Sequence, residues 1–222
     1  MPGCTGRPAA HPERRRPTAM SEPVLESPQR PPTLHVIVLA AGASTRFGSP
    51  KQLVRLNGRP LLHLAVSRAV AVAGQAVTVV LGAHAAELAP LLRHTPATVV
   101  INRDWAEGMG SSVRTGVTAV PATADAAMLM LADQPAITPE DLRRLVATWR
   151  RQPQCIVAAH YAGTAGVPAI FPREDFAALG ALRGDSGARA LLRQGGRRVV
   201  RVPLQSAAVD IDTPEDLLNL HH

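Results

Sequence analysis

Aromatic and cysteine residues are scarce in this chain, and long apolar runs are missing. Among 222 residues there are two Trp, one Tyr and three Phe, so a core has to be built from Ala, Val and Leu. No run of about 18 apolar residues occurs, and we therefore expect no membrane-spanning helix. Of the two cysteines, Cys4 lies in a polar segment and Cys155 begins an apolar run. A structural disulfide is not expected, and a reducing cytoplasm is the natural location.

The positive charge of the chain does not predict a nucleic-acid partner. The formal net charge is +7, but the arginine clusters at 14–16, 143–144, 150–151 and 197–198 fall on separate segments. No aromatic residues are interleaved with these clusters to stack on bases. Solvated helix faces and strand ends explain the clusters, with some attraction for anionic substrates.

The first 32 residues have a composition of their own. They are rich in Pro, Arg, Ser and Glu and contain almost no large apolar side chains, which predicts a disordered basic tail over 1–32. No apolar stretch follows its arginines, so the tail does not resemble a signal peptide, and Met20 is an alternative start. Residues 33–222 form one predicted domain, which is long enough for a full core.

Apolar runs alternate with helical patterns from residue 34 onward. This alternation predicts an α/β fold, a single three-layer domain with a mostly parallel sheet, helices on both faces and an antiparallel insertion around 154–171. The predicted strands are 34–39, 77–81, 97–101, 127–131, 154–159 and 198–202. The predicted helices are 60–73, 84–93, 111–120, 139–151, 172–179, 186–193 and 214–220. Ligands of such sheets bind at the carboxyl ends of strands, so functional residues are expected just after strands.

The segment after the first predicted strand is suited to binding a polyphosphate. The apolar run Val36–Leu39 stops at Ala40-Ala41-Gly42, and a loop of small residues follows that carries Arg46 and Lys51. Small residues let backbone N–H groups approach an anion, and the cations neutralise it. The loop lacks the Gly-Lys-Ser/Thr end of a Walker A motif and the three close glycines of a dinucleotide fingerprint. For Ala-Ala-Gly in isolation, a tight turn with incidental surface cations is the simpler interpretation.

Three acids stand where a metal would be held. Asp133 follows the apolar run Met128–Leu131, where a carboxylate costs free energy unless it is paired or binds a metal; a loop or helix cap is the alternative. Asp210 and Asp212 point to the same side of a short extended segment. Mg²⁺ usually takes one or two carboxylates plus substrate phosphates. Asp133 with Asp212 or Asp210 meets that requirement, and we prefer Asp212 because it lies nearer a helix start.

Several polar segments lead into predicted helices. In 102–116, the glycines free the backbone, and Ser111 and Ser112 can cap the helix or donate hydroxyls to a base, a ribose or a phosphate. In 184–189, Asp185 or Ser186 can cap the helix and Arg189 is available for an anion. On physical grounds alone, ordinary helix caps are the favoured interpretation of both segments. Thr-Pro-Glu-Asp-Leu, at 138–142 and 213–217, predicts two further helix starts with Thr as N-cap and no chemistry.

Together these strings resemble a known family. Residues 39–51 match L-A-A-G-x-S-x-R-x-G-x-x-K, which resembles the signature of sugar-nucleotide and cofactor nucleotidyltransferases. Residues 102–112 match N-x-x-W-x-x-G-M-x-S-S, which resembles the base- and ribose-reading segment of molybdenum-cofactor cytidylyltransferases, in the MobA-like nucleotidyltransferase family. In that group, strings similar to 166–168 and 184–189 lie where the pterin partner docks. The resemblance covers about residues 35 to 218 and implies the Rossmann-like nucleotidyltransferase fold.

The resemblance also implies a set of site residues. The catalytic residues would be Arg46 and Lys51. The nucleotide-binding residues would be Leu39, Ala40, Ala41, Gly42, Ser44, Gly82, Gly108, Met109, Ser111, Ser112 and Asp133. The second substrate would contact Gly166, Pro168, Gly184, Asp185 and Arg189. The metal, Mg²⁺, would be held by Asp133 with Asp212 or Asp210.

The implied reaction transfers CMP from CTP to molybdenum-bound molybdopterin and gives the cytosine dinucleotide cofactor and pyrophosphate. A molybdoenzyme or its maturation chaperone is the implied protein partner. Ala41 favours CTP, because guanylyl relatives tend to have Leu-Ala-Gly-Gly, whereas Ser49-Pro50 departs from the Gly-Asp that often precedes the lysine in the cytidylyl branch. The alternatives are a relative that uses GTP or a sugar or alcohol phosphate acceptor, and a non-catalytic cofactor-delivery protein. Against the last, a pure binder need not keep both the cations and the metal acids.

Overall fold

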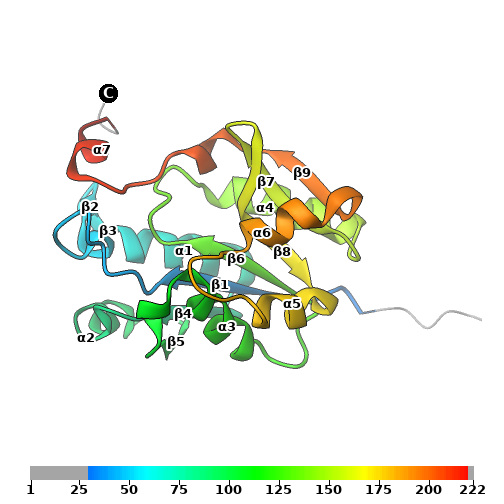
Figure 1. Cartoon of the computed structure of the whole chain (residues 1–222), viewed down its shortest axis with the longest axis horizontal. Helices are drawn as coiled ribbons and strands as arrows, with labels where there is room; N and C mark the ends of the chain where they lie inside the picture. Colours follow the sequence, from blue (N-terminus) through cyan, green and yellow to red (C-terminus); the bar gives the residue numbers. More distant parts are fainter. Residues whose placement is uncertain (1–29, 220–222) are drawn as a thin grey trace, which may run out of the picture. The chain divides into compact units, whose positions relative to one another are not determined.

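The computed structural model describes residues 30–219 (Figure 1). The chain divides into two units, Met1–Pro31 and Pro32–His222, and every described helix and strand lies in the second. The tail predicted over residues 1–32 falls outside the described residues except at its very end. Within the described range, no helix is long and apolar enough to cross a membrane.

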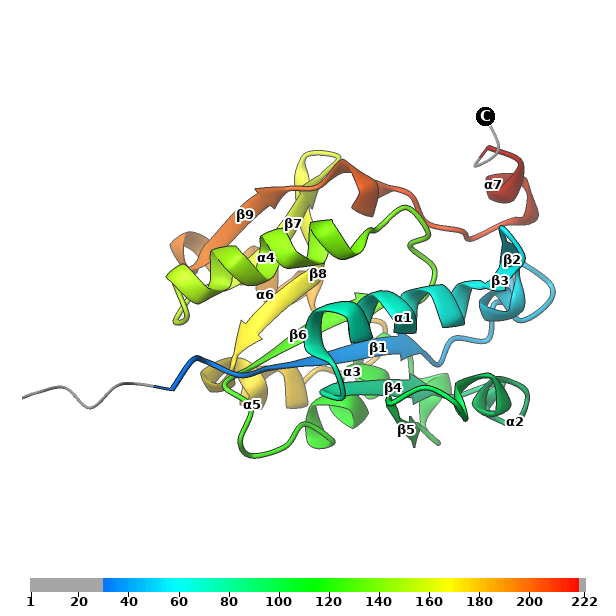
Figure 2. The same ribbon diagram turned by 180° about the vertical axis from the view of Figure 1, so that it is seen from behind.

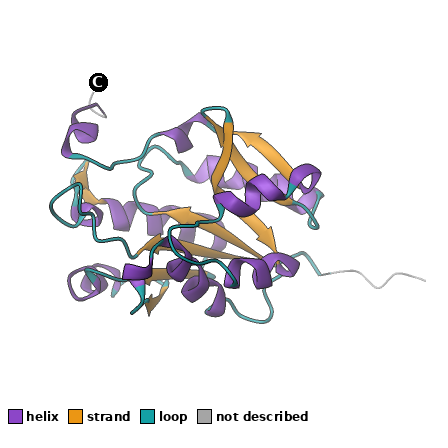
Figure 3. Cartoon of the chain, viewed as in Figure 1, coloured by secondary structure: helices purple, strands orange, loops and turns teal. Residues whose placement is uncertain are grey.

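A seven-stranded sheet in the order β5-β4-β1-β6-β8-β7-β9 forms the middle of the second unit (Figure 3). Its strands are β1 (Leu34–Ala40), β4 (Val77–Leu81), β5 (Thr98–Ile101), β6 (Ala126–Leu131), β7 (Ile156–Tyr161), β8 (Thr164–Pro172) and β9 (Val199–Pro203). All neighbours pair in parallel except β8, which runs antiparallel to both β6 and β7. The mostly parallel sheet with an antiparallel insertion is confirmed.

Helices cover both faces of the sheet, which confirms the three predicted layers. Successive residues of β1 alternate between two apolar clusters, Val36 and Val38 in one and Ile37 and Leu39 in the other. The first face carries α1 (Leu61–Ala73), α2 (Ala85–Leu88) and α4 (Pro139–Arg151), and the second carries α3 (Met109–Thr118), α5 (Phe176–Gly180) and α6 (Arg189–Gln194). Figure 1 shows the second set in front of the sheet, and Figure 2 shows α1 and α4 from behind.

Three predicted helices differ from the observed ones by more than two residues at one end. The helix expected at 84–93 is the short α2 followed by the 3₁₀ helix η2 (Ala89–Leu92), because Pro90 has no N–H to continue an α-helix. The helix expected at 172–179 begins as η4 (Arg173–Asp175) and becomes α5. The helix expected at 186–193 begins three residues later, as α6.

The repeated Thr-Pro-Glu-Asp-Leu string marks two helix starts, as predicted. Thr138 is the N-cap of α4, and its Oγ1 accepts a hydrogen bond from the backbone N–H of Asp141 at 3.1 Å. Before α7 (Pro214–Asn219), Thr213 donates its backbone N–H to Asp216 Oδ2 at 2.8 Å. The first copy is a complete capping box, in which each side chain bonds to the other residue's backbone.

A small hairpin was missed by the sequence analysis. The strands β2 (Arg55–Leu56) and β3 (Arg59–Pro60) pair antiparallel around a two-residue turn. Asn57 and Gly58 adopt φ angles of 51° and 78°. Positive φ at both positions is what a tight hairpin turn requires, and Asn-Gly is its commonest sequence signal. The hairpin lies between η1 (Lys51–Leu53) and α1, so it joins the loop after β1 to the first helix.

Candidate active site

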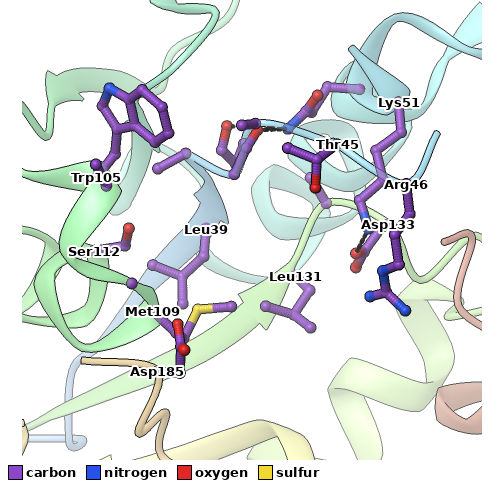
Figure 4. A pocket seen from close by; sticks show the side chains of 18 residues that line it. Leu39, Thr45, Arg46, Lys51, Trp105, Met109, Ser112, Leu131, Asp133 and Asp185 are labelled. Atoms are coloured by element: carbon purple, nitrogen blue, oxygen red, sulfur yellow. Dashed lines mark hydrogen bonds and ion pairs between the residues drawn. The ribbon is translucent and has the colours of Figure 1, made fainter. Parts of the chain in front are cut away.

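A cavity of about 440 Å³ opens at the carboxyl ends of β1 and β6. Figure 4 shows Arg46, Lys51 and Asp133 on one side of it and Trp105, Met109 and Asp185 on the other. Its lining consists of Leu39, Ala40, Ala41, Gly42, Ala43, Thr45, Arg46, Lys51, Gln52, Trp105, Ala106, Gly108, Met109, Ser112, Leu131, Ala132, Asp133 and Asp185. The cavity therefore lies where ligands bind in parallel sheets, directly after the two central strands.

The loop after β1 is held in shape by two side chains of its own. Gln52 is buried and donates its Nε2 to the carbonyls of Ala40, at 3.3 Å, and Gly42, at 3.1 Å. Ser44, at a φ of 55°, accepts a hydrogen bond at its Oγ from the backbone N–H of Lys51 at 3.2 Å and donates to Gln52 Oε1 at 3.3 Å. These bonds fold the loop back on itself and bring Lys51 close to the carboxyl end of β1. Ser44, to which the resemblance assigns a nucleotide contact, thus also holds the loop, and the clamping role of Gln52 has no signal in the sequence pattern.

Lys51 joins two carboxylates that come from distant parts of the chain. Its Nζ lies 2.6 Å from Asp133 Oδ2 and 2.8 Å from Asp212 Oδ1. Arg46 Nη2 contacts the other oxygen of Asp212 at 2.7 Å. The backbone N–H of Ile211 donates to the carbonyl of Asp133 at 3.0 Å, which places Asp212 beside the end of β6. Of the cations and acids singled out in the sequence, Arg46, Lys51, Asp133 and Asp212 thus form one cluster.

The two cations of this cluster differ in exposure. The side chain of Lys51 is only 16% exposed, whereas that of Arg46 is 73% exposed. The loop predicted to carry both cations is therefore open only at Arg46, because Lys51 lies in η1 and is enclosed by its ion pairs. Burial disfavours its ammonium, but the charges of Asp133 and Asp212 outweigh burial and raise the pKa of Lys51. Lys51 therefore stays charged at neutral pH.

Asp210 and Asp212, which lie between η6 (Gln205–Ala208) and α7, are distinguished by their neighbours. The hydrogen bond from Lys51, aided by the charge of Arg46, lowers the pKa of Asp212. Burial, together with the charges of Asp212 and Asp133, raises the pKa of Asp210. Asp210 lines a neighbouring cavity and, among the described residues, forms an ion pair with neither cation, whereas Asp212 bonds to both. Of the two, Asp212 shares Lys51 with Asp133.

The cluster offers a divalent metal two carboxylates and no more. Among residues 30–219, no group of three or more His, Cys, Asp and Glu side chains is arranged to hold a metal ion. One oxygen of Asp133, Oδ1, is buried without a hydrogen-bond partner in the described part of the chain. An unpaired carboxylate oxygen next to a second carboxylate is a hard-oxygen donor set that suits Mg²⁺ completed by phosphate oxygens.

A second cavity of about 380 Å³ adjoins the first. Four residues, Leu39, Met109, Leu131 and Asp185, line both. The remaining lining of the second cavity is Val113, Leu129, Gln134, Tyr161, Ala162, Gly166, Val167, Gly187, Ala188, Arg189, Ala207, Ala208 and Asp210. Its walls come mainly from the β7–β8 hairpin, the start of α6 and η6 (Gln205–Ala208). All of these lie far C-terminal to the loop after β1.

The serines at the start of α3 do not cap it, contrary to prediction. The helix begins at Met109, and its N-cap is Gly108, with no capping bond from a side chain. Ser111 instead donates its Oγ to the carbonyl of Gly108 at 2.8 Å, and both Ser111 and Ser112 accept hydrogen bonds from Asn102 Nδ2. Asn102 thereby ties the end of β5 to α3. Ser112 still lines the first cavity, whereas Ser111 is buried beneath it.

The loop 183–187 lies tightly against the start of α3. Gly108 has a φ of 116°, and a Cβ there would lie 2.5 Å from Asp185 Oδ1 and 2.6 Å from the carbonyl carbon of Gly184. The backbone N–H of Gly110 donates to the carbonyl of Gly184 at 2.8 Å. Asp185 is thus positioned between the two cavities by contact with glycines. Asp185 and Ser186, the two candidate caps in the sequence, do not cap α6. Its N-cap is Ala188, and no side chain makes a capping hydrogen bond.

Most of the predicted site residues line one of these cavities. In the first are Leu39, Ala40, Ala41, Gly42, Arg46, Lys51, Gly108, Met109, Ser112, Asp133 and Asp185, and in the second are Gly166, Arg189 and Asp210. Ser44 and Asp212 line a smaller hollow of about 150 Å³ beside the first. Gly82, Ser111, Pro168 and Gly184 line none of the three. Gly82 instead lets the chain pass close to Ala41, since a Cβ there would lie 2.5 Å from the Ala41 carbonyl oxygen.

The comparisons with known proteins place this architecture in a family. The family model described as the MobA-like NTP transferase domain matches residues 36–199, and the chain belongs to this family. Nicotine blue oxidoreductase of Paenarthrobacter nicotinovorans is 32% identical over 200 residues, which are 85% of this chain and 97% of that protein. The purine catabolism protein PucB of Bacillus subtilis is 32% identical over 84% of this chain and 95% of its own length.

Solved structures agree with the fold. Rv0371c of Mycobacterium tuberculosis superposes with a TM-score of 0.75 at 28% identity and covers 86% of this chain and 98% of its own. Another structure of Rv0371c, a complex with manganese, gives a TM-score of 0.73 at 28% identity over 85% of this chain and 97% of that one. The recognised family and the α/β nucleotidyltransferase fold are therefore confirmed, and the protein is a nucleotidyltransferase of the MobA-like family.

Proposed function

We propose that this protein transfers CMP from CTP to the phosphate of molybdenum-bound molybdopterin and releases pyrophosphate. The observation that carries the proposal is the Lys51 cluster beside two adjoining cavities, one for each substrate. The first cavity begins at the small-residue loop and suits the nucleotide. The second, reached past Leu39 and Leu131, suits the acceptor. Asp185, which lines both, marks the boundary where the two substrates would meet.

The proposed chemistry needs no protein nucleophile. An oxygen of the acceptor phosphate attacks the α-phosphorus of CTP in line, a new P–O bond forms, and the bond to the β-phosphate breaks to release pyrophosphate. Lys51 and Arg46 neutralise the charge that accumulates on the phosphates. The raised pKa of Lys51 keeps it cationic for this role. Rate enhancement then comes from positioning and from charge neutralisation rather than from covalent catalysis.

The metal of the proposed reaction is Mg²⁺, bound by Asp133 and Asp212. The unpaired Oδ1 of Asp133 and the adjacent Asp212 carboxylate support this assignment, and Asp210 is the alternative ligand. When bound with substrate phosphates, the ion would neutralise charge on the triphosphate. The related Rv0371c has been solved as a manganese complex, and Mn²⁺ prefers the same oxygen ligands.

The choice of CTP rests on the residues around the base. Ala41 is 4% exposed and lines the first cavity, and its Cβ would lie 2.8 Å from a Cβ placed on Gly82. A methyl group at this position narrows the space beside the base, and a purine is the larger ring. Discrimination by one methyl group is worth about 1–3 kcal/mol, so other groups of the lining share the selection.

Pyrophosphate release tests the proposal. Each of the four nucleoside triphosphates is incubated with the protein and Mg²⁺, with and without molybdenum-bound molybdopterin. Release from CTP that requires the acceptor is the expected result. Release from GTP at an equal kcat/KM would overturn the base assignment, and release with a sugar or alcohol phosphate in place of the pterin would overturn the acceptor. Tight nucleotide binding without any release would favour a cofactor-delivery protein that serves a molybdoenzyme or its chaperone.

The name of one relative gives a second candidate that the same preparation can test. The similarity to nicotine blue oxidoreductase extends over 97% of that protein. A redox activity on a dye-like substrate is therefore the competing function. The chain lacks the three-glycine dinucleotide fingerprint after β1, which disfavours a nicotinamide cofactor there. Oxidation of NADH or NADPH with a quinonoid dye, at a rate unaffected by Lys51→Ala, would support the redox function instead.

A further inference from the structure

Gln134 is a buried amide with one unused hydrogen-bonding atom. The residue follows Asp133 and is 5% exposed. Its Nε2 donates to the carbonyl of Ala207 at 2.9 Å and to that of Val167 at 3.2 Å. Its Oε1 is buried and has no hydrogen-bond partner among the residues that the structure describes.

The orientation of this amide is fixed by its neighbours. Both partners of Nε2 are carbonyl oxygens, which only accept hydrogen bonds. If the amide were flipped, its oxygen would face these two carbonyl oxygens and no hydrogen bond could form. The backbone is held as well, because Arg68 donates to the carbonyls of Gln134, at 3.4 Å, and Pro135, at 2.7 Å. The unpaired oxygen is therefore a fixed feature of the site. A buried acceptor without a partner is costly, which calls for a donor from outside the chain.

The second cavity is where such a donor can come from. Gln134 belongs to its lining, together with the apolar side chains of Leu39, Leu129, Leu131 and Val113. Apolar walls of this kind suit the faces of a flat ring, and a polar group among them reads its edge. The cavity's other polar side chains are acceptors, Asp185 and Asp210, apart from the cation Arg189 and the hydroxyl of Tyr161, which donates to the Val167 carbonyl at 3.3 Å.

We propose that Gln134 is a specificity-determining residue of the acceptor cavity, whose Oε1 accepts a hydrogen bond from an N–H on the edge of a flat heterocycle. The cavity supplies acceptors and one cation, so its ligand carries donors on its ring and a negative charge elsewhere. This inference rests on the proposed function in taking the second cavity as the acceptor site. It adds the atom that selects an acceptor with an N–H-bearing ring over acceptors without such a ring, such as sugar or alcohol phosphates.

Binding of pterin and two analogues to the full chain tests this inference. One analogue, 3-methylpterin, has its ring N–H blocked, and the other, 4-hydroxypteridine, lacks the exocyclic amino group. Fluorescence titration of the unmodified protein should show that at least one analogue binds about tenfold more weakly than pterin, the scale of one hydrogen bond. In Gln134→Met, that difference should disappear. In Gln75→Met, the same substitution at an exposed turn, it should persist.

The comparison within each protein separates recognition from stability. Gln134→Met also loses the bonds to Val167 and Ala207, so its melting temperature will fall, but the ratio of pterin to analogue affinity is measured in one folded protein. If Gln134→Met does not fold, Gln134→Asn replaces it, since its shorter amide cannot reach the same positions. Discrimination that survives in the variant, its absence from the unmodified protein, or no binding of pterin would each overturn the inference. Intact discrimination without CTP turnover would overturn the proposed function alone.

Discussion

The ammonium of Lys51 lies 2.6 Å from Asp133, and the two residues come from loops that follow the two central, adjacent strands β1 and β6. The pairing of Leu39 with Leu131 brings the ends of these strands together. Asp212 then reaches the same ammonium from the far end of the chain, at 2.8 Å. In the proposed reaction, this shared cation would exchange its carboxylate partners for substrate phosphates, and the unpaired oxygen of Asp133 would be available to a metal ion.

Removing either cation of this cluster should slow turnover, with different effects on stability. Arg46→Ala and Lys51→Ala should each lower kcat by about 10², because each removes a positioned charge from the phosphates. Lys51→Ala should also lower the free energy of unfolding by about 1–3 kcal/mol, since it leaves the partly buried Asp133 without its cation and Asp212 with Arg46 alone. Arg46→Ala should leave stability unchanged, because its side chain is 73% exposed. Urea unfolding and steady-state kinetics measure both effects. Near-normal turnover in either folded variant would contradict the assigned role.

Replacing Asp133 or Asp212 by Asn should affect the Mg²⁺ dependence of turnover more than replacing Asp210. Asp133→Asn and Asp212→Asn should abolish or strongly weaken Mg²⁺-dependent turnover, because an amide is a poorer ligand for a hard cation than a carboxylate. Asp210→Asn should raise the KM for the acceptor more than the Mg²⁺ requirement, because Asp210 lines the second cavity. Turnover measured against Mg²⁺ concentration ranks the three. A larger loss of metal dependence in Asp210→Asn than in Asp212→Asn would reverse the choice between them, and no change in any variant would remove the metal site.

Gly42, which lines the first cavity, and Gly82, which lies against Ala41, should respond differently to substitution by alanine. Gly82→Ala places a Cβ 2.5 Å from the Ala41 carbonyl oxygen and 2.7 Å from Trp105 Cβ, so backbone has to move. The expected cost is about 1–3 kcal/mol of unfolding free energy, the range for overpacking. A Cβ at Gly42 meets nothing within 4 Å, so Gly42→Ala should leave stability unchanged and lower the affinity for nucleotide. Equal melting temperatures for the two variants would show that the close approach at Gly82 is not as tight as described.

Acid should weaken the contact that holds the loop 183–187. A hydrogen bond from Arg114 and one from the backbone N–H of Gly184 lower the pKa of Glu107 from 4.5 to about 2. Because the folded pKa is depressed, the stabilisation is complete above about pH 4.5 and is lost as pH falls toward 2. The melting temperature of Glu107→Gln should therefore lie below that of the unmodified protein at pH 7, and the gap should narrow by pH 3. A gap of constant size would show that the carboxylate charge does not contribute.

The sequence predicted the sheet and the acid cluster because both depend on local pattern. Buried parallel strands are continuous apolar runs, and Asp133 stands at the end of one. What it could not predict were contacts that form only once the backbone has folded, whether within one loop or between distant segments. Three examples are the hydrogen bond from Gln52 to the Ala40 carbonyl, the close approach of Gly82 to Ala41, and the hydrogen bond from Gln134 to the Ala207 carbonyl. Each depends on which backbone segments meet after folding. The predicted serine caps failed because Asn102, across the loop, competes for the same hydroxyls.

The product formed from a mixture of substrates tests the central claim most directly. The protein is incubated with equal concentrations of ATP, CTP, GTP and UTP, Mg²⁺ and molybdenum-bound molybdopterin, and the dinucleotide product is identified by mass spectrometry. Lys51→Ala, treated in the same way, serves as the control for catalysis by this site. The proposed function predicts the cytosine dinucleotide cofactor, strongly reduced in the control. A guanine dinucleotide, or no dinucleotide while the protein still binds CTP, would contradict it.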